Sequence, residues 1–205
     1  MGWLLYQFFC ALFAIVFRII FRTRVTGRDR VPSTGPLLLV SNHTSLADPP
    51  LLGVACPRQV NFMAMVELFR HPVLAQLVRA VGSFPVDRSR VDHSAVRETI
   101  RRLRAGKCVA IFPEGGIRLD AKSVLGGDPC IRPGVETLAL LGEAAILPVI
   151  IRGSRKPYAW RNWFKRETMS VTFGNPYCLW KTAHASRQDY LGIVREQLLK
   201  TVELG

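Results

Sequence analysis

Short apolar runs alternate with helix-like segments along most of the chain. Most of these runs are continuously apolar, which is typical of strands that are covered on both faces of a sheet. The runs with strand character are residues 36–40, 60–65, 83–87, 108–112, 146–152 and 169–173. Strands that alternate with helices predict an α/β fold.

The predicted helices lie between and after these runs. Residues 93–105 have the clearest helical spacing, because Val96, Ile100 and Leu103 share one face and Gly106 follows. The other predicted helices are residues 66–82, with a kink or boundary at Pro72, residues 134–145, and a C-terminal helix marked by Leu191, Val194, Leu198 and Val202. We expect a single α/β domain with a mostly parallel or mixed central sheet flanked by helices.

The N-terminal segment has a different pattern, because residues 3–21 are apolar apart from Gln7 and Arg18. A helix of this length measures about 28 Å, close to the thickness of a hydrocarbon core. Phenylalanines recur at every fourth position from Phe9 to Phe21 and stack along one helix face. The pattern predicts a membrane-associated helix that either spans the bilayer or lies in its interface, with a buried core helix as the alternative.

Arginines at and beyond the end of this segment suggest its orientation. The apolar run has no basic residues before it, and it is followed by arginines at positions 22, 24, 28 and 30. This order is not that of a cleaved signal peptide. The positive-inside rule places the arginine flank on the cytoplasmic face of the cell membrane. We therefore expect residues 1–24 to anchor a domain made of residues 25–205.

Composition narrows the functional classes. A hydrophobic fraction of 49% excludes intrinsic disorder, and 205 residues suit one domain with its own core. The net charge of +13 requires an anionic partner, which is nucleic acid, an anionic membrane or a phosphorylated ligand. The five cysteines form no CxxC pair and no zinc-ligand spacing with histidine. We expect reduced cysteines and no metal site.

The first candidate site is the polar segment NHTSLADPP after the predicted strand 36–40. His43 and Asp48 can meet only if the chain bends, since five residues along a strand separate them by about 16 Å. If they meet, Asp48 orients one ring nitrogen and the other serves as a base. The alternative is that Asp48 caps a helix that begins at Pro49. A Ser–His nucleophile is less favoured because the chain lacks a GxSxG elbow.

Three further segments carry candidate chemistry. After the strand 108–112, Glu114, Gly115 and Arg118 lie in a glycine turn, which has a solvated glutamate as its simpler interpretation. Arg88 follows the predicted strand 83–87 and is suited to binding phosphate. Residues 155–166, RKPYAWRNWFKR, have the composition of a membrane-interface contact, of a single-stranded nucleic-acid contact, or of a basic surface loop.

Four blocks in order resemble the glycerolipid acyltransferases, the family of lysophosphatidic acid acyltransferase. NHTSLAD resembles the family's NHxxxxD block, and FPEG matches the third block letter for letter. The second block is matched at Gly82, Phe84 and Arg88, and the fourth is resembled by ILPVIIRG around Pro148. The resemblance runs from about residue 25 to residue 177.

The resemblance implies an O-acyltransferase that moves a fatty acyl group from an acyl thioester of coenzyme A or acyl carrier protein. The implied acceptor is a lysophospholipid, foremost 1-acyl-sn-glycerol-3-phosphate, and the product is then phosphatidic acid. His43 is the implied general base and Asp48 its orienting partner, without a metal or resident cofactor. The tetrahedral oxyanion would need donors, which we expect among backbone N–H groups near the start of the helix after Asp48.

Arg88, Glu114 and Gly115 belong, by the same resemblance, to acceptor and phosphate recognition. One departure concerns the residues after FPEG, where many members carry Thr-Arg-Ser and this chain has Gly116-Ile117-Arg118. Arg118 therefore either replaces the missing arginine or points elsewhere.

Competing hypotheses come from other classes of protein. One is an acyltransferase with a different lyso-lipid acceptor, and another is a non-catalytic basic module that binds membrane or nucleic acid. A third is a metal-dependent hydrolase that uses His43 and Asp48, although His71, His93 and His184 are isolated in the sequence. The preferred hypothesis expects an anionic membrane surface, a lysophospholipid and an acyl donor as partners, and no nucleic acid.

Overall fold

The structure is a computed structural model that describes residues 2–87, 89, 92–119, 121–155, 167–181 and 186–204. Within these residues, seven strands form one sheet in the order β1-β7-β6-β2-β5-β3-β4. The strands are β1 (Arg22–Thr26), β2 (Leu37–Ser41), β3 (Val60–Met65), β4 (Phe84–Val86), β5 (Cys108–Ile111), β6 (Ala145–Arg152) and β7 (Thr168–Phe173). The helices are α1 (Gly2–Ile20), α2 (Asp48–Ala55), α3 (Pro72–Ala80), α4 (His93–Arg104), α5 (Val135–Leu141) and α7 (Arg187–Glu203), with short 3-10 helices η1 (Arg28–Arg30), η2 (Val66–Phe69), η3 (Val124–Gly126) and η5 (Leu179–Lys181).

The centre of the sheet is parallel and one edge is not. Strands β6, β2, β5, β3 and β4 run in the same direction. Strand β7 is antiparallel to β6, and β1 pairs with β7 in parallel. The expected mixed α/β sheet is therefore confirmed, and β2 lies at its centre with β5 and β6 on its two sides.

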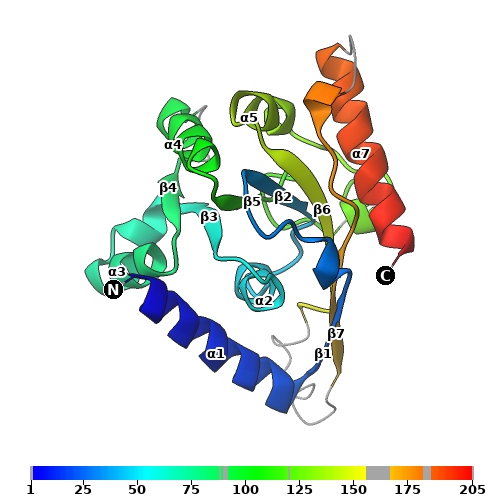
Figure 1. Cartoon of the computed structure of the whole chain (residues 1–205). Coiled ribbons are helices and arrows are strands. Elements are labelled where there is room, and N and C mark those ends of the chain that lie inside the picture. The colour runs from blue at the N-terminus through cyan, green and yellow to red at the C-terminus, as the bar shows by residue number, and fades with distance from the viewer. Residues whose placement is uncertain are drawn as a thin grey trace.

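Helices cover both faces of the sheet (Figure 1). Leu37 and Leu39 of β2 point into a core that includes residues of α1 and α2, whereas Leu38 and Val40 point into a core with residues of α4, α5 and α7. All four leucine and valine side chains are fully buried. The continuous apolar run of β2 is thus explained by burial on both faces.

Strand β1 was not predicted from the sequence, and helix α2 was expected only as a helix that starts after Asp48, without a predicted end. Strand β1 reads RTRVT and is mostly exposed, so it lacks the apolar run that marks the other strands. It begins inside the segment of residues 1–24 that we expected to be the anchor. Helix α2 is only eight residues long and starts with Asp48 and two prolines, a sequence that resembles a connection between strands.

Two predicted helices are shorter than expected. The predicted helix 66–82 is divided into η2 and α3, and α3 begins at Pro72, where a proline needs no hydrogen-bonded N–H. The predicted helix 134–145 spans only Val135–Leu141. It is followed by Gly142 and by Glu143, whose positive φ of 49° is incompatible with a continuing helix.

Helix α1 packs against the domain through one face. Phe17 of α1 and Phe21 after it join the core that includes α2. The Tyr6 hydroxyl accepts a hydrogen bond from the Val60 N–H at 3.1 Å and donates to the Gly53 carbonyl at 3.5 Å. Phe17 and Phe21 of the predicted phenylalanine face therefore meet the domain, whereas Phe13 of the same face is 37% exposed.

The other face of α1 is apolar and exposed. The exposed large apolar side chains of α1 are Leu4, Leu5, Phe8, Leu12, Phe13, Ile15, Val16 and Ile19. Among the described residues, no helix has both the length and the apolar character required to cross a membrane. The expectation of a spanning helix at the N-terminus therefore has no support.

Candidate active site

The loop after β2 brings His43 and Asp48 together. The His43 Nδ1 atom lies 2.9 Å from Asp48 Oδ2. Both residues are buried, because His43 is 4% exposed and Asp48 is 0% exposed. Because a carboxylate can only accept, Nδ1 is the donor in this bond. In the neutral imidazole, the remaining ring nitrogen, Nε2, is then an acceptor. The bend that the sequence analysis required between these residues is present.

The same Asp48 oxygen also organises the bend. Oδ2 accepts hydrogen bonds from the N–H groups of Thr44 and Ser45, at 2.7 and 2.8 Å. Helix α2 does begin at Asp48, but the carboxylate turns back to the preceding loop, and the position before the helix is held by Ala47. The helix-cap interpretation of Asp48 is therefore wrong, although the helix boundary is right.

The start of α2 cannot supply the oxyanion donors that we expected there. Pro49 and Pro50 have no N–H group, and the Leu51 N–H donates to the Ala47 carbonyl at 3.0 Å. This part of the prediction is wrong, because the two prolines that start the helix remove the donors of its first turn.

Glu114 joins the His43 loop to the turn after β5. Its Oε2 accepts the His43 N–H and its Oε1 accepts the Val124 N–H, both at 2.7 Å. Glu114 is 1% exposed, so the interpretation as a solvated turn glutamate is wrong. Burial raises the pKa of Glu114, and the two backbone hydrogen bonds oppose that rise. Its part in acceptor recognition stays a prediction.

The turn after β5 requires glycine and brings Arg118 next to His43. Gly115 has a φ of 73°, in the left-handed region that favours glycine. The Arg118 N–H donates to the His43 carbonyl at 2.9 Å, and its Nε donates to the Glu114 carbonyl at 3.2 Å. Ile117 is 44% exposed. Arg118 thus helps to hold the loop that carries His43.

A cavity of about 630 Å³ gives access to His43. It lies between α1, α2, β3 and α3, and its lining includes Phe9 and Phe13 of α1 as well as Ile117. The His43 ring stacks on the Phe112 ring with 4.2 Å between their centres. The walls are mostly apolar, which suits a lipid chain.

Sequence reasoning missed the residues in and after β6 that hold the His43 loop in place. The Asn42 side chain forms two hydrogen bonds to the backbone of Ile151, at 2.7 and 2.8 Å. Thr44 Oγ1 and Ser154 Oγ are 2.9 Å apart, and Ser45 Oγ donates to the Ser154 carbonyl at 2.8 Å. No spacing rule could connect positions that lie more than 100 residues apart in the chain. The hydroxyl of Ser45, a candidate nucleophile in the Ser–His alternative, is thus bonded to the backbone of another loop.

Two sequence predictions fall outside the described part of the chain. Arg88 is not among the described residues, so its predicted contact with phosphate stays a prediction. The same holds for the basic-aromatic segment 155–166 beyond Arg155. In the described ranges, no three His, Cys, Asp or Glu side chains cluster as metal ligands.

Comparison with known proteins gives consistent results. A family model described as "Acyltransferase" matches residues 22–152. A 1-acyl-sn-glycerol-3-phosphate acyltransferase of Bacillus subtilis is 24% identical over 200 residues, which cover 97% of this chain and 96% of that protein. A protein of the same name from Streptococcus pneumoniae is 28% identical over 151 residues, which cover 72% of this chain and 53% of that protein.

A solved structure shares the fold. The crystal structure of the 1-acyl-sn-glycerophosphate (LPA) acyltransferase PlsC from Thermotoga maritima matches with a TM-score of 0.74 and 22% identity. The match covers 99% of this chain and 79% of the other. The family match includes β1 to β6 and therefore all the residues that form the His43 loop and the turn after β5. The chain belongs to the acyltransferase family and is an enzyme of that class.

Proposed function

We propose that this enzyme transfers a fatty acyl group from an acyl thioester to the free hydroxyl of 1-acyl-sn-glycerol-3-phosphate, which gives phosphatidic acid. The observation that carries the proposal is the buried hydrogen bond between His43 and Asp48 at the wall of an apolar cavity. The relatives named as 1-acyl-sn-glycerol-3-phosphate acyltransferases support the choice of acceptor.

His43 is the proposed general base. With Nδ1 bonded to Asp48, Nε2 takes the proton of the acceptor hydroxyl as the oxygen attacks the thioester carbonyl. The new C–O bond gives a tetrahedral oxyanion, which collapses as the C–S bond breaks. The proton then passes from His43 to the departing thiolate. The negative charge of Asp48 stabilises the protonated imidazole between these two steps.

Glu114 and Arg118 are proposed as positioning residues for this step. Glu114 holds the His43 backbone N–H, and the Arg118 N–H holds the His43 carbonyl. Together they fix the peptide of the base from both sides. A base that is held within a fraction of an ångström of its working position loses less entropy in the transition state.

We propose that the enzyme works at the cytoplasmic face of an anionic membrane. Support comes from the exposed apolar face of α1 and from the arginines that follow it. A helix with one apolar face lies in the interface plane, and basic residues are attracted to anionic lipids. Both substrates carry long acyl chains, so a cavity that borders α1 is well placed to receive them from a bilayer.

The test is an assay of thiol release and lipid product with purified full-length protein in detergent or vesicles. Acyl-CoA and acyl carrier protein thioesters are each combined with lysophosphatidic acid, lysophosphatidylcholine and monoacylglycerol, with and without a chelator. We expect phosphatidic acid, with thiol release that depends on lysophosphatidic acid and is unaffected by the chelator. Thiol release without an acceptor would indicate a hydrolase, and the absence of transfer to every acceptor would overturn the proposal.

A further inference from the structure

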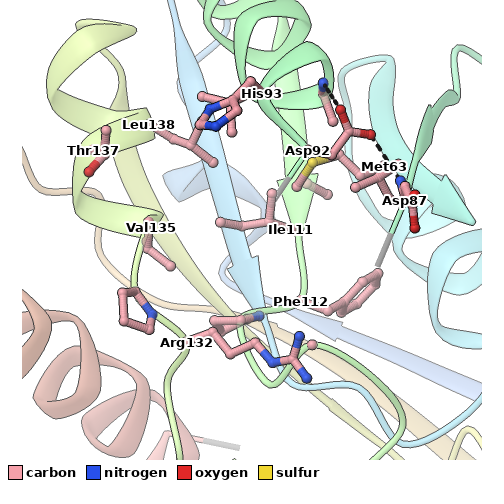
Figure 2. Close-up of a pocket in the computed structure, with 18 residues that line it drawn as sticks. Met63, Asp87, Asp92, His93, Ile111, Phe112, Arg132, Val135, Thr137 and Leu138 are labelled. Carbon is pink, nitrogen blue, oxygen red and sulfur yellow. Dashed lines mark hydrogen bonds between the residues drawn. The ribbon is translucent and has the colours of Figure 1, made fainter. Parts of the chain in front are cut away.

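A second cavity adjoins the His43 cavity at Phe112. Its volume is about 790 Å³, and it lies between α4 and α5 at the carboxyl end of β5. Met63 and Phe112 line both cavities. Figure 2 shows mostly apolar walls, with His93 and Asp92 at one end and Arg132 beside Phe112 at the other.

Arg132 lies directly on the turn that follows β5. Its N–H donates to the Pro113 carbonyl at 2.9 Å. Its side chain covers Gly115 so closely that a Cβ atom at this glycine would collide with Nε and Cζ of Arg132. The glycine of the turn is therefore needed both for its backbone conformation and for the place of this guanidinium.

The guanidinium of Arg132 forms no hydrogen bond or ion pair within the described part of the chain. Some of the other arginines there are engaged: Arg58 donates to four backbone carbonyls, and Arg102 donates to Asn61, Glu98 and Gly82. At the same turn, Arg118 donates to the Glu114 carbonyl. Among the described residues, Arg132 has neither a hydrogen bond nor an ion pair from its side chain, and it is exposed. An exposed fork of five donors at the edge of an active site is suited to an anion.

We propose that Arg132 binds a phosphate group of one of the two substrates. This inference rests on the proposed function, in which both the lysophosphatidic acid acceptor and a coenzyme A donor carry phosphate. Arg132 lies beside Phe112 (Figure 2), and the Phe112 ring stacks on His43, so the Phe112 side chain connects the guanidinium to the base. It would supply the cation that the sequence lacks at Ile117. Arginine binds phosphate through two parallel hydrogen bonds, which also fix the orientation of the bound molecule.

The experiment compares Arg132→Gln with a matched control, Arg97→Gln. Arg97 is an exposed arginine of α4 that lines neither cavity, so its substitution removes the same charge away from the site. We expect Arg132→Gln to raise the KM of the phosphate-bearing substrate by about 10- to 100-fold with a smaller change in kcat, since a lost hydrogen bond to a charged group has that size. Arg132→Lys should recover part of the loss, and Arg97→Gln should change each KM by about 2-fold or less.

Substrate analogues identify which phosphate is bound. If it is that of the acceptor, wild type and Arg132→Gln should use monoacylglycerol equally well. If it belongs to coenzyme A, the two proteins should become equal with an acyl-N-acetylcysteamine donor, which lacks phosphate. Either result supports the inference. Unchanged KM values for both substrates in Arg132→Gln, or equal changes in the Arg97→Gln control, would overturn it.

A binding measurement separates this inference from the proposed function. Phenylglyoxal modifies exposed arginines, and mass spectrometry follows the modification of Arg132 and Arg97 separately. Lysophosphatidic acid or coenzyme A should protect Arg132 and leave Arg97 reactive, even if no acyl transfer is observed with wild type. Equal modification with and without both ligands would overturn the inference, whereas an active wild type in that experiment would leave the proposed function intact.

Discussion

Residues 41–45 and Asp48 are each exposed by 6% or less, whereas Leu4, Phe8 and Ile19 of α1 are each exposed by 60% or more. The first group is largely polar and is buried, and the second is apolar and faces outward. In soluble proteins polar side chains usually lie outside and large apolar side chains inside. The two regions are connected by one cavity, because His43 lines it together with other residues of α1, among them Phe9 and Leu12.

The two regions tolerate their unusual placement for different reasons. The buried loop is stable because most of its polar groups form hydrogen bonds, with partners that include Asp48, Glu114, Ser154 and Ile151. Removing one partner there leaves a buried group unsatisfied. The exposed apolar side chains of α1 carry no polar groups that need a partner, and their exposed area is of the kind that marks an interaction surface. Substitutions should therefore affect catalysis in the first region and surface binding in the second.

The largest expected effect is that of His43→Ala. It should lower kcat by on the order of 10² to 10⁴ because the proposed general base is lost. Unfolding temperature and vesicle binding should change little, since α1 is untouched. His71→Ala is the control, because His71 is exposed and lies before α3. Near-normal turnover by His43→Ala would show that the assignment of the base is wrong.

Asp48→Asn should lower kcat by on the order of 10²-fold, which is a loss milder than or comparable to that of His43→Ala. The amide oxygen can still accept the N–H groups of Thr44 and Ser45, but the charge that stabilises a protonated His43 is gone. The measurement is kcat together with thermal unfolding. A variant that keeps its stability and loses turnover supports the orienting role, and one with full turnover contradicts it.

Substitution of Glu114 should affect catalysis less than substitution of His43 or Asp48. Glu114→Ala leaves two buried N–H groups without acceptors and should cost about 1–3 kcal/mol of unfolding free energy for each. As a positioning residue it should affect kcat more than the KM of the acceptor. A selective rise in acceptor KM would instead support the recognition role that the resemblance implies.

The pH dependence of stability gives a second test of Glu114. Because burial raises its pKa, the stability that this group contributes is fully present below its unfolded pKa and is lost as the pH rises through its folded pKa. Glu114→Gln does not titrate, so this decline should be absent from its unfolding free energy. Denaturant unfolding between about pH 4 and pH 7 compares the two proteins. Identical pH profiles would show that Glu114 is not desolvated.

The sequence predicted the central strands well because burial on both faces produces long apolar runs. Strand β3 was predicted at its observed bounds, and β2, β5, β6 and β7 within one residue at either end. The edge strand β1 has one neighbour and a polar sequence, so it lacks that signal. A helix after Asp48 was considered, but its end was not predicted, because two prolines and Gly53 are also typical of a connection.

The sequence also predicted the contact between His43 and Asp48, but not the hydrogen bonds that hold their loop in place. His43 and Asp48 were close enough in the chain for their contact to be proposed. The bonds from Glu114 to His43, and from Asn42 to Ile151, join segments separated by 71 and 109 residues. Such pairs are fixed by the order of β2, β5 and β6 in the sheet. That order cannot be derived from apolar periodicity.

Substitutions on the outer face of α1 should have the smallest effect on catalysis. They should have the largest effect on binding of the protein to membranes. Deletion of α1 is a poor test, because Phe17 and Tyr6 belong to the core. Phe8→Ser with Ile19→Ser removes two side chains that are 60% and 67% exposed, so the domain should remain folded. If these side chains enter a membrane interface, their loss costs about 2–4 kcal/mol of binding free energy and lowers the partition to anionic vesicles at least about 30-fold.

The matched control for this double variant is Leu141→Ser with Leu204→Ser. These leucines are 48% and 50% exposed, and they lie at the ends of α5 and α7, on the other side of the sheet from α1. Flotation with anionic vesicles measures binding at low and high salt. High salt should weaken the contribution of the arginines to vesicle binding and leave the apolar contribution unchanged, since screening acts on charges alone. Turnover on detergent-dispersed substrate should remain near that of wild type in both variants. Equal flotation of the two double variants would show that the outer face of α1 does not contact the membrane.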